Sequence, residues 1–295
     1  MTTVLISGAD GFIAQHVAAN LNTLGCRKIG VSIEKKELNY FDSVYEGHLT
    51  FPLKDVFQHE DIDVFIHCAN HTGGDEFRVN VEGTRIWAEQ AQEKGVNTQI
   101  FISSLSARKD SVSSYGQAKF EIEKWFVKNK QFVCRFGLVA GCGGLFWRMM
   151  SQVKKNLILP LPDAGRIWVY LTDIGHVCQF LKNFVKNENY LEKGKIYNFF
   201  QPSPFSLKSL MLEVKKQQRT FCFFVPVSSR FLLFALGALE ALPLSKSNFS
   251  RNNILGMLQN SRLDVHSDFS QFGISESSVE DMVSRALQSY KEDVL

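Results

Sequence analysis

The sequence predicts an α/β protein with a doubly wound parallel sheet and a smaller, mostly helical C-terminal substrate lobe. Short β-branched runs alternate with segments of helical periodicity over the first two-thirds of the chain, which is typical of parallel strands joined by right-handed crossovers. A glycine-rich turn joins the first strand to the first helix. The last third loses this alternation and is rich in Phe and Leu. A Rossmann-type fold accounts for these observations.

The composition excludes several classes of protein. Apolar residues make up 45% of the 295-residue chain and charged residues 21%, which excludes disordered and coiled-coil proteins. The 33 basic and 30 acidic side chains leave a formal charge of +3, which is too balanced for a nucleic-acid partner. The six cysteines and seven histidines show no metal-ligand spacing, so we expect no bound metal.

The sequence carries no signal for secretion or for crossing a membrane. The N-terminus has no basic region and enters a strand pattern at once, so we expect a cytoplasmic protein. The longest apolar stretch, Phe231–Leu244, contains Glu240 and is shorter than the roughly 20 residues of a spanning helix. A C-terminal stretch is rich in aromatic residues, namely Phe221, Phe223, Phe224, Phe231 and Phe234. We interpret these residues as part of the hydrophobic core, with peripheral membrane contact as the alternative.

Strands and helices alternate in a clear order over the first 200 residues. Strands are expected over Val4–Ser7, Lys28–Ser32, Val64–Ala69, Ile100–Ser104, Phe132–Phe136 and Ile196–Phe200. Helices are expected over Phe12–Leu24, Val79–Lys94 and Tyr115–Lys128. We therefore expect residues 1–140 to form the dinucleotide-binding core, with the sheet completed by about 167–200. Residues 141–166 and 201–295 are expected to form the substrate-binding lobe.

The turn after the first strand has the features of a dinucleotide site. Gly8 and Gly11 lie between the strand and the first helix, with the small Ala14 three residues later. Glycine lets the backbone approach a pyrophosphate, and the following helix N-terminus offers unpaired N–H groups. A strand–turn–helix start of this kind favours dinucleotide binding over an ordinary βα turn.

The end of the second strand bears on the choice between NAD and NADP. Ser32 stands where an acidic residue would bind the ribose hydroxyls of NAD. Arg27, Lys35 and Lys36 are near enough in sequence to neutralise a 2′-phosphate, whereas Glu34 still suits NAD. We therefore favour NADP and keep NAD as the alternative.

A Tyr-x-x-x-Lys pair opens the third predicted helix. The i, i+4 spacing places Tyr115 and Lys119 on one helix face, and an ammonium there lowers the pKa of a phenol. The preceding strand ends in Ser103-Ser104, which can supply a hydroxyl to a substrate oxygen. Together these residues predict a general acid/base site.

At this point the chain resembles an extended short-chain dehydrogenase/reductase of the NAD-dependent epimerase/dehydratase (sugar-nucleotide) family. The segment GADGFIA is similar to TGxxGFIG of the family, and Asn80–Thr84 to its NVxGT helix. Ile102-Ser103-Ser104 resembles the strand of the catalytic serine, and Arg135–Gly141 the RPGxVYG segment. Val64–Ala69 resembles the DVVIHLAA strand.

The resemblance implies roles for individual residues. Ser104, Tyr115 and Lys119 would form the catalytic site, with Ser103 as the second choice for the serine. Lys119 would also bind the nicotinamide ribose, and Arg166, Trp168 and Tyr170 are candidates for substrate contact. Cofactor contacts are expected from Gly8, Gly11, Phe12, Ile13, Ser32, Lys35, Asp55, Val56, Cys68, Ala69, Ser103, Gly137, Leu138 and Val139.

The implied activity is hydride transfer at a carbon of a nucleotide sugar, as 4-keto reduction or 4-epimerisation in polysaccharide biosynthesis. Dehydration is disfavoured because Leu105-Ser106 follows the serine where family 4,6-dehydratases carry an Asp-Glu pair. The resemblance also suggests a homodimer. The loop between Ser104 and Tyr115 is short, however, and so the alternative is a non-catalytic NADP(H)-binding module that acts as a scaffold or redox sensor.

Overall fold

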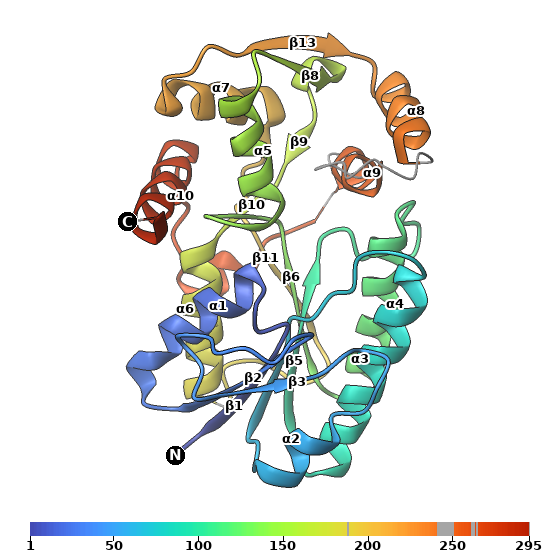
Figure 1. Ribbon diagram of the computed structural model, residues 1–295, viewed down its shortest axis with the longest axis vertical. Helices are drawn as coiled ribbons and strands as arrows, with labels where there is room; N and C mark the ends of the chain where they lie inside the picture. The colour runs from blue at the N-terminus through green and yellow to red at the C-terminus, as the bar shows by residue number, and fades with distance from the viewer. Residues whose placement is uncertain (188, 241–250, 261–262, 264, 295) are drawn as a thin grey trace. The chain divides into compact units, whose positions relative to one another are not determined.

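The computed structural model describes residues 1–187, 189–240, 251–260, 263 and 265–294 (Figure 1). The chain forms two compact units. Unit 1 comprises Met1–Asp110, Ser114–Arg135 and Ile174–Tyr197. Unit 2 comprises Ser111–Ser113, Phe136–Asp173 and Asn198–Leu295. The apolar stretch expected over Phe231–Leu244 continues past residue 240 into residues outside the described part.

Among the described residues, seven strands form the central sheet in the order β11-β6-β5-β4-β1-β2-β3. Their bounds are β1 Thr3–Ser7, β2 Arg27–Ser32, β3 Ser43–Glu46, β4 Val64–His67, β5 Thr98–Ser104, β6 Phe132–Phe136 and β11 Ile196–Phe199. β1 pairs in parallel with β2 on one side and with β4 on the other. The strand order therefore reverses at β1, and a ligand is expected outside the carboxyl ends of the strands at such a point.

Helices cover both faces of this sheet in unit 1. Figure 1 shows α1 (Phe12–Leu21) and α6 (Ile174–Lys186) on one side, and α3 (Glu76–Glu93) and α4 (Ser114–Lys128) on the other. The short α2 (Lys54–His59) lies near the amino-terminal edge in the same view. β4 is buried along its whole length, which explains why it is apolar except for its last residue, His67.

Unit 2 combines small paired strands with helices around a separate apolar core. The strands are β7 Leu138–Ala140, β8 Ile158–Pro162, β9 Trp168–Val169, β10 Leu171–Asp173, β12 Phe205–Ser206 and β13 Phe223–Val227. The helices are α5 Gly144–Lys155, α7 Leu207–Gln218, α8 Ser229–Glu240, α9 Arg251–Asn260 and α10 Val279–Val294. α5, α7 and α10 supply most of the buried side chains of this core.

The predicted α/β fold class is confirmed, and the six predicted strands are present with ends that differ by at most two residues. The predicted first helix ends earlier, at Leu21, and a 3-10 turn (Asn22–Leu24) completes it before the left-handed Gly25. The strand β3 and the helix α2 were not predicted. Within the described residues, no helix is both long enough and apolar enough to span a membrane.

Candidate dinucleotide and proton-transfer site

The turn between β1 and α1 is built around two glycines that have no room for a side chain. Gly8 has φ = +66°, and a Cβ on it would lie 2.9 Å from the Cα of Ala69. A Cβ on Gly11 would lie 2.9 Å from the carbonyl oxygen of Gly8, which accepts the Gly11 N–H at 2.8 Å. Phe12 and Ile13 follow in the first turn of α1. This turn can hold a pyrophosphate against backbone N–H groups.

Ser7, which the sequence patterns did not single out, joins the carboxyl ends of β1 and β4. Its hydroxyl accepts the backbone N–H groups of Cys68 and Ala69, each at 3.1 Å. Burial raises the pKa of the Cys68 thiol to about 12, so that this side chain stays neutral at physiological pH. The turn that carries Gly8 is thereby held against the loop after β4.

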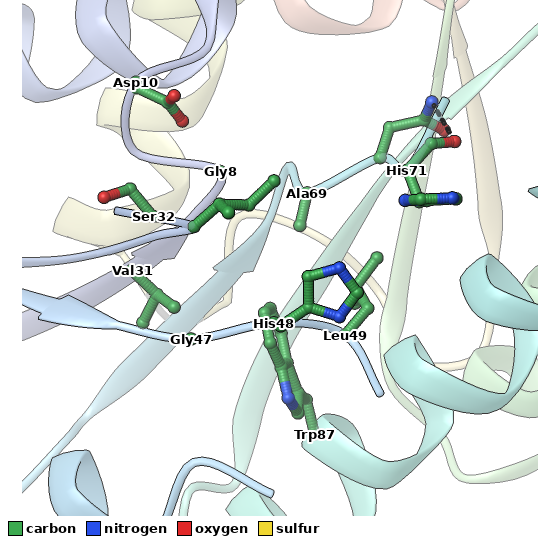
Figure 2. A pocket seen from close by; sticks show the side chains of 12 residues that line it. Gly8, Asp10, Val31, Ser32, Gly47, His48, Leu49, Ala69, His71 and Trp87 are labelled. Atoms are coloured by element: carbon green, nitrogen blue, oxygen red, sulfur yellow. Dashed lines mark hydrogen bonds between the residues drawn. The ribbon is translucent and has the colours of Figure 1, made fainter. Parts of the chain in front are cut away.

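A cavity of about 80 Å³ opens beside this turn, and Figure 2 shows the side chains around it. Gly8, Ser32 and Ala69, all expected from the sequence, line it. It is also lined by residues that were not expected, namely Asp10, Val31, Ile33, Gly47, His48, Leu49, Asn70, His71 and Trp87. The buried Trp87 donates its indole N–H to the carbonyl oxygen of Phe51 at 2.7 Å. An aromatic ring and the ends of four strands, β1 to β4, therefore form a pocket of a kind that suits a nucleoside.

Asp55 and Val56 do not line this pocket, contrary to the expectation that they lie near an adenine. Both belong to α2, and Val56 is buried in the core of unit 1. The residues that follow β3 and reach the pocket are Gly47, His48 and Leu49 instead. The sequence did not single out these three residues, because β3 has no strong strand pattern.

The loop after β4 is held by the asparagine of the NVxGT segment. Asn80 accepts the backbone N–H of His71 at 2.8 Å and donates to the His71 carbonyl oxygen at 2.9 Å. The His71 ring lies 5.9 Å from the ring of His48, between centroids. Two imidazoles thus line the pocket wall, where they can contact a nucleotide.

The basic residues near the end of β2 differ in their positions. The Ser32 hydroxyl donates to the Glu34 carbonyl oxygen, and Ser32 lines the pocket. Lys36 forms an ion pair with Asp10, with 3.2 Å between Nζ and Oδ2. Lys35 is exposed and is not among the lining residues.

Tyr115, Ser104 and Lys119 come together where β5 ends and α4 begins. Burial raises the pKa of Tyr115 to about 12; a hydrogen bond from Ser104 opposes this shift, and the charge of Glu76 adds to it. The Lys119 ammonium donates to the Ile102 carbonyl oxygen at 2.9 Å and lies 5.7 Å from the centre of the Tyr115 ring. Burial lowers the pKa of Lys119 to about 8. The phenol is therefore protonated at neutral pH, with a cation nearby.

The two serines of β5 have different surroundings. Ser103 is buried and donates to Glu123 at 2.6 Å, and Arg135 donates to the same carboxylate at 2.7 and 2.5 Å. Ser104 is only half-buried and accepts the N–H of Ser106 at 3.2 Å. The alternation of the strand thus directs Ser104 to Tyr115 and Ser103 to the ion pair.

The remaining candidate residues belong to unit 2. Gly137 donates its N–H to the Thr172 hydroxyl at 3.0 Å, and Leu138 donates its N–H to the Tyr170 carbonyl oxygen at 2.8 Å. Val139 of β7 lies opposite Thr172 of β10. The Tyr170 hydroxyl donates to the carbonyl oxygen of Leu263 at 3.1 Å. Arg166 and Trp168 are exposed. These contacts fix the backbone of unit 2. The expected roles of Gly137–Val139 toward cofactor and of Arg166, Trp168 and Tyr170 toward substrate stay predictions.

Replacing Gly8 with Ala is expected to weaken dinucleotide binding by at least about 10-fold, because the added Cβ meets the Ala69 backbone. Gly25→Ala is the matched control. Gly25 has φ = +62°, and a Cβ added there would meet no heavy atom within 4 Å. In both variants the alanine has a left-handed backbone conformation, which costs about 1–2 kcal/mol, but only Gly8→Ala also introduces a steric clash. Isothermal titration with NAD and NADP measures the difference, and equal losses in the two variants would contradict the close-approach argument.

Part of the chain matches a known protein family. Residues 4–129 match the NAD dependent epimerase/dehydratase family, which confirms the resemblance seen in the motifs. No curated protein matches the sequence.

Similar solved structures share the fold over nearly the whole chain. A UDP-glucose 4-epimerase from Thermotoga maritima is 15% identical, with a TM-score of 0.73 and 100% of both chains covered. A dTDP-glucose 4,6-dehydratase from Bacillus anthracis, in complex with NAD, is 12% identical, with a TM-score of 0.75 and 99% of this chain and 97% of that one covered. MoeE5 in complex with UDP-glucose and NAD is 16% identical, with a TM-score of 0.75 and coverage of 99% and 100%.

Proposed function

We propose that this chain, whose residues 4–129 match the NAD dependent epimerase/dehydratase family, transfers hydride between an NAD-type dinucleotide and a sugar carbon of a nucleotide sugar. The reaction would be a 4-keto reduction or a 4-epimerisation. The observation that carries the proposal is the grouping of Ser104, Tyr115 and Lys119 at the carboxyl end of β5, two strands away from the glycine turn after β1. Similar structures were solved with UDP-glucose and with NAD, which supports the substrate class.

The residues of unit 1 fit a dinucleotide, because Gly8 lines the pocket and the glycine turn leads directly into the N-terminus of α1. Gly8 and Gly11 would hold the pyrophosphate, and the pocket of Ser32, His48 and Trp87 would hold the adenosine. When bound, the nicotinamide would accept or supply the hydride. Ser104 would orient the sugar oxygen, and a proton would pass between that oxygen and the Tyr115 hydroxyl.

The charges at this site favour donation of a proton by Tyr115. Its pKa of about 12 keeps it protonated at neutral pH, and the Lys119 ammonium, with a pKa of about 8, can stabilise the phenolate that remains after transfer. A protonated Tyr115 suits the reduction of a carbonyl. Epimerisation uses the same residues in both directions.

Dehydration is not proposed, although dehydratases are among the similar structures. Leu105 and Ser106, both buried, follow Ser104 and provide no carboxylate to eliminate water. The carboxylate that acts on Tyr115 is that of Glu76, the first residue of α3, and it accepts the Ser114 hydroxyl at 2.9 Å.

A second candidate, a module that binds the dinucleotide without turnover, is favoured by one observation. Burial and the charge of Glu76 both oppose ionisation of Tyr115. A tyrosine with only a structural role does not need to ionise, so these surroundings would not impair it. The two candidates differ in turnover and agree on cofactor binding.

The experiment uses the purified full chain. Any dinucleotide that co-purifies is released and identified, and oxidation of NADPH and NADH is then followed with UDP-, GDP- and dTDP-4-keto sugars. Parent nucleotide sugars are assayed for epimerisation. Turnover on any of these substrates supports the proposed enzyme. Tight cofactor binding without turnover across the panel would favour the binding module.

Replacing Ser32 with Asp is expected to raise the Kd for NADP on the order of 10-fold relative to that for NAD, since a carboxylate binds ribose hydroxyls and repels a 2′-phosphate. Ser32→Ala removes the hydroxyl without adding charge and should leave the ratio within about 2-fold of wild type. Titration with both cofactors gives the ratio. If Ser32→Asp leaves it unchanged, the adenosine ribose does not bind at the end of β2.

A further inference from the structure

Unit 2 exposes large apolar side chains in two short segments. Of the fifteen large hydrophobic residues exposed in the described part of the chain, seven lie in residues 157–158 and 221–234. They are Leu157, Ile158, Phe221, Phe223, Val225, Phe231 and Phe234, and we call them the apolar face. Phe221 is 86% exposed and Phe234 is 75% exposed, so that these rings are almost fully in solvent. Isolated apolar residues on a surface are common, whereas such a concentration indicates a binding surface.

The strand part of the apolar face is one side of a two-stranded sheet. β13 runs parallel to β8, with Phe223 opposite Ile158 (Figure 1). Phe223 and Val225 point outward, and Phe224 between them packs against the core of unit 2. The side chains on both sides of β13 are thus apolar, although unit 2 covers only one of these sides.

The helix part shows the same excess of apolar residues. Residues 231–238 of α8 have the sequence FLLFALGA and contain no polar side chain. Leu232 and Leu236 face a cavity of about 200 Å³ inside unit 2, whereas Phe231 and Phe234 are exposed. A helix that is apolar all round normally has an apolar environment on every side. Here the unit supplies that environment on one side only.

Positive charge accompanies this face. Residues 154–166 and 207–238 contain eight basic and two acidic side chains, a formal +6 in a chain whose total is +3. Both acids are engaged: Asp163 accepts the Ser229 N–H at 2.9 Å, and Glu213 pairs with Lys216 at 3.3 Å. The Lys215 ammonium lies 5.7 Å from the centre of the Phe223 ring. The rest of the sequence therefore carries a net −3, and the cations are concentrated in the segments that carry the apolar face.

We propose that the apolar face seats on an anionic phospholipid bilayer, with Phe side chains at the boundary of headgroups and acyl chains and Lys and Arg side chains at the lipid phosphates. Apolar side chains together with basic ones are the combination that holds a protein in the plane of a membrane surface. A second copy of this chain is a poorer occupant, because two segments of +6 would face each other. The proposal does not depend on the hydride-transfer function.

Sedimentation with vesicles tests this proposal on the full chain. The probes are vesicles of phosphatidylcholine alone and of phosphatidylcholine with phosphatidylglycerol. We expect binding to the anionic vesicles, at least about 10-fold weaker binding to the neutral ones, and release by salt. Binding to neither vesicle, or equal binding to both, would overturn the proposal.

Variants locate the contact. Phe231→Ser/Phe234→Ser should lower the partition onto anionic vesicles by at least about 10-fold. Phe51→Ser is the matched control, because Phe51 is 67% exposed but lies in unit 1, and it should bind vesicles as wild type does. Lys154→Gln/Lys155→Gln, which changes no apolar residue, should weaken binding and reduce its salt dependence.

Two further measurements complete the test. Dinucleotide affinity, measured without vesicles, should be unchanged in Phe231→Ser/Phe234→Ser and in Lys154→Gln/Lys155→Gln. This result separates the proposal from the proposed function and shows that these variants fold. Light scattering gives the oligomeric state. Vesicle binding that Phe231→Ser/Phe234→Ser leaves intact, or a wild-type oligomer that this variant dissociates, would assign the face to another role and overturn the proposal.

Discussion

Replacing Tyr115 with Phe is expected to lower kcat by about 10²–10⁴-fold and to leave the dinucleotide bound, because only the hydroxyl that exchanges the proton is removed. The ring stays, and with it the neighbouring Lys119 ammonium, which is held by the Ile102 carbonyl oxygen. Steady-state rates with a 4-keto sugar, together with cofactor titration, measure the two effects separately. A variant that keeps wild-type turnover would remove Tyr115 from the mechanism.

The pH dependence of the wild type is a second readout of the same site. The buried Lys119 has a pKa of about 8 and loses its positive charge above that pH. Tyr115, with a pKa of about 12, remains protonated over the same range. We therefore expect kcat to fall as the pH rises through about 8, because the cation that stabilises the phenolate is lost. Lys119→Met should be slow at all pH values and should show no such fall.

The elements with strong local signals were predictable from the sequence, and the weaker ones were not. β1, β4 and β5 each contain three consecutive buried apolar residues, and glycines mark where several of the helices end. β3 (SVYE) has no fully buried residue, and α2 has only six residues, so neither has a clear periodicity. The family resemblance implied Asp55 and Val56 as cofactor contacts, whereas His48 and Leu49 are among the residues after β3 that line the pocket.

The sequence identified candidate site residues more readily than it distinguished the roles of neighbouring candidates. The motif favours Ser104 over Ser103 only by alignment, and the physical difference between the two serines arises from tertiary contacts. The partner of Ser103 is Glu123, twenty residues further along the chain, and the charge that holds Glu123 comes from Arg135 on β6. In unit 2 the usual assignment of apolar residues to the core fails for Phe223 and Phe231, because their outward positions are apolar as well.

Arg135→Met is expected to destabilise the protein by about 3–5 kcal/mol, because it leaves the carboxylate of Glu123 buried without a cation. The Glu123 side chain is only 1% exposed and receives two hydrogen bonds from Arg135. Met retains much of the volume of Arg, so that the loss reports charge and hydrogen bonding more than packing. The denaturant midpoint of unfolding measures the change.

Lys124→Met provides the matched control on the same helix. It breaks the ion pair with Glu121, whose 2.7 Å separation is close to that of the buried pair but whose partners are 58% and 39% exposed. An exposed pair contributes only about 0–1 kcal/mol, because water and salt screen it. Comparable losses in the two variants would show that burial of Glu123 does not set the cost.

The cost of Arg135→Met should also depend on pH, and its sign follows from the pKa of Glu123. Burial raises this pKa in the native protein, and hydrogen bonding from Arg135 opposes the rise, so the variant should raise it further. Unfolded, the carboxyl ionises near its reference pKa of about 4.3. Between that value and the native pKa the folded state binds the extra proton, and stability falls as the pH rises. The variant should therefore lose most stability at neutral pH and recover toward pH values of about 4.5.

Glu123→Gln combined with Arg135→Met separates the charge from the shape of the site. Gln has nearly the volume of Glu and can still accept a hydrogen bond from Ser103, but it leaves no buried charge when the guanidinium is gone. The double variant should recover part of the loss at neutral pH and show little of the pH dependence of Arg135→Met alone. A double variant as unstable as Arg135→Met, with the same pH profile, would mean that the carboxylate of Glu123 is not the source of the instability.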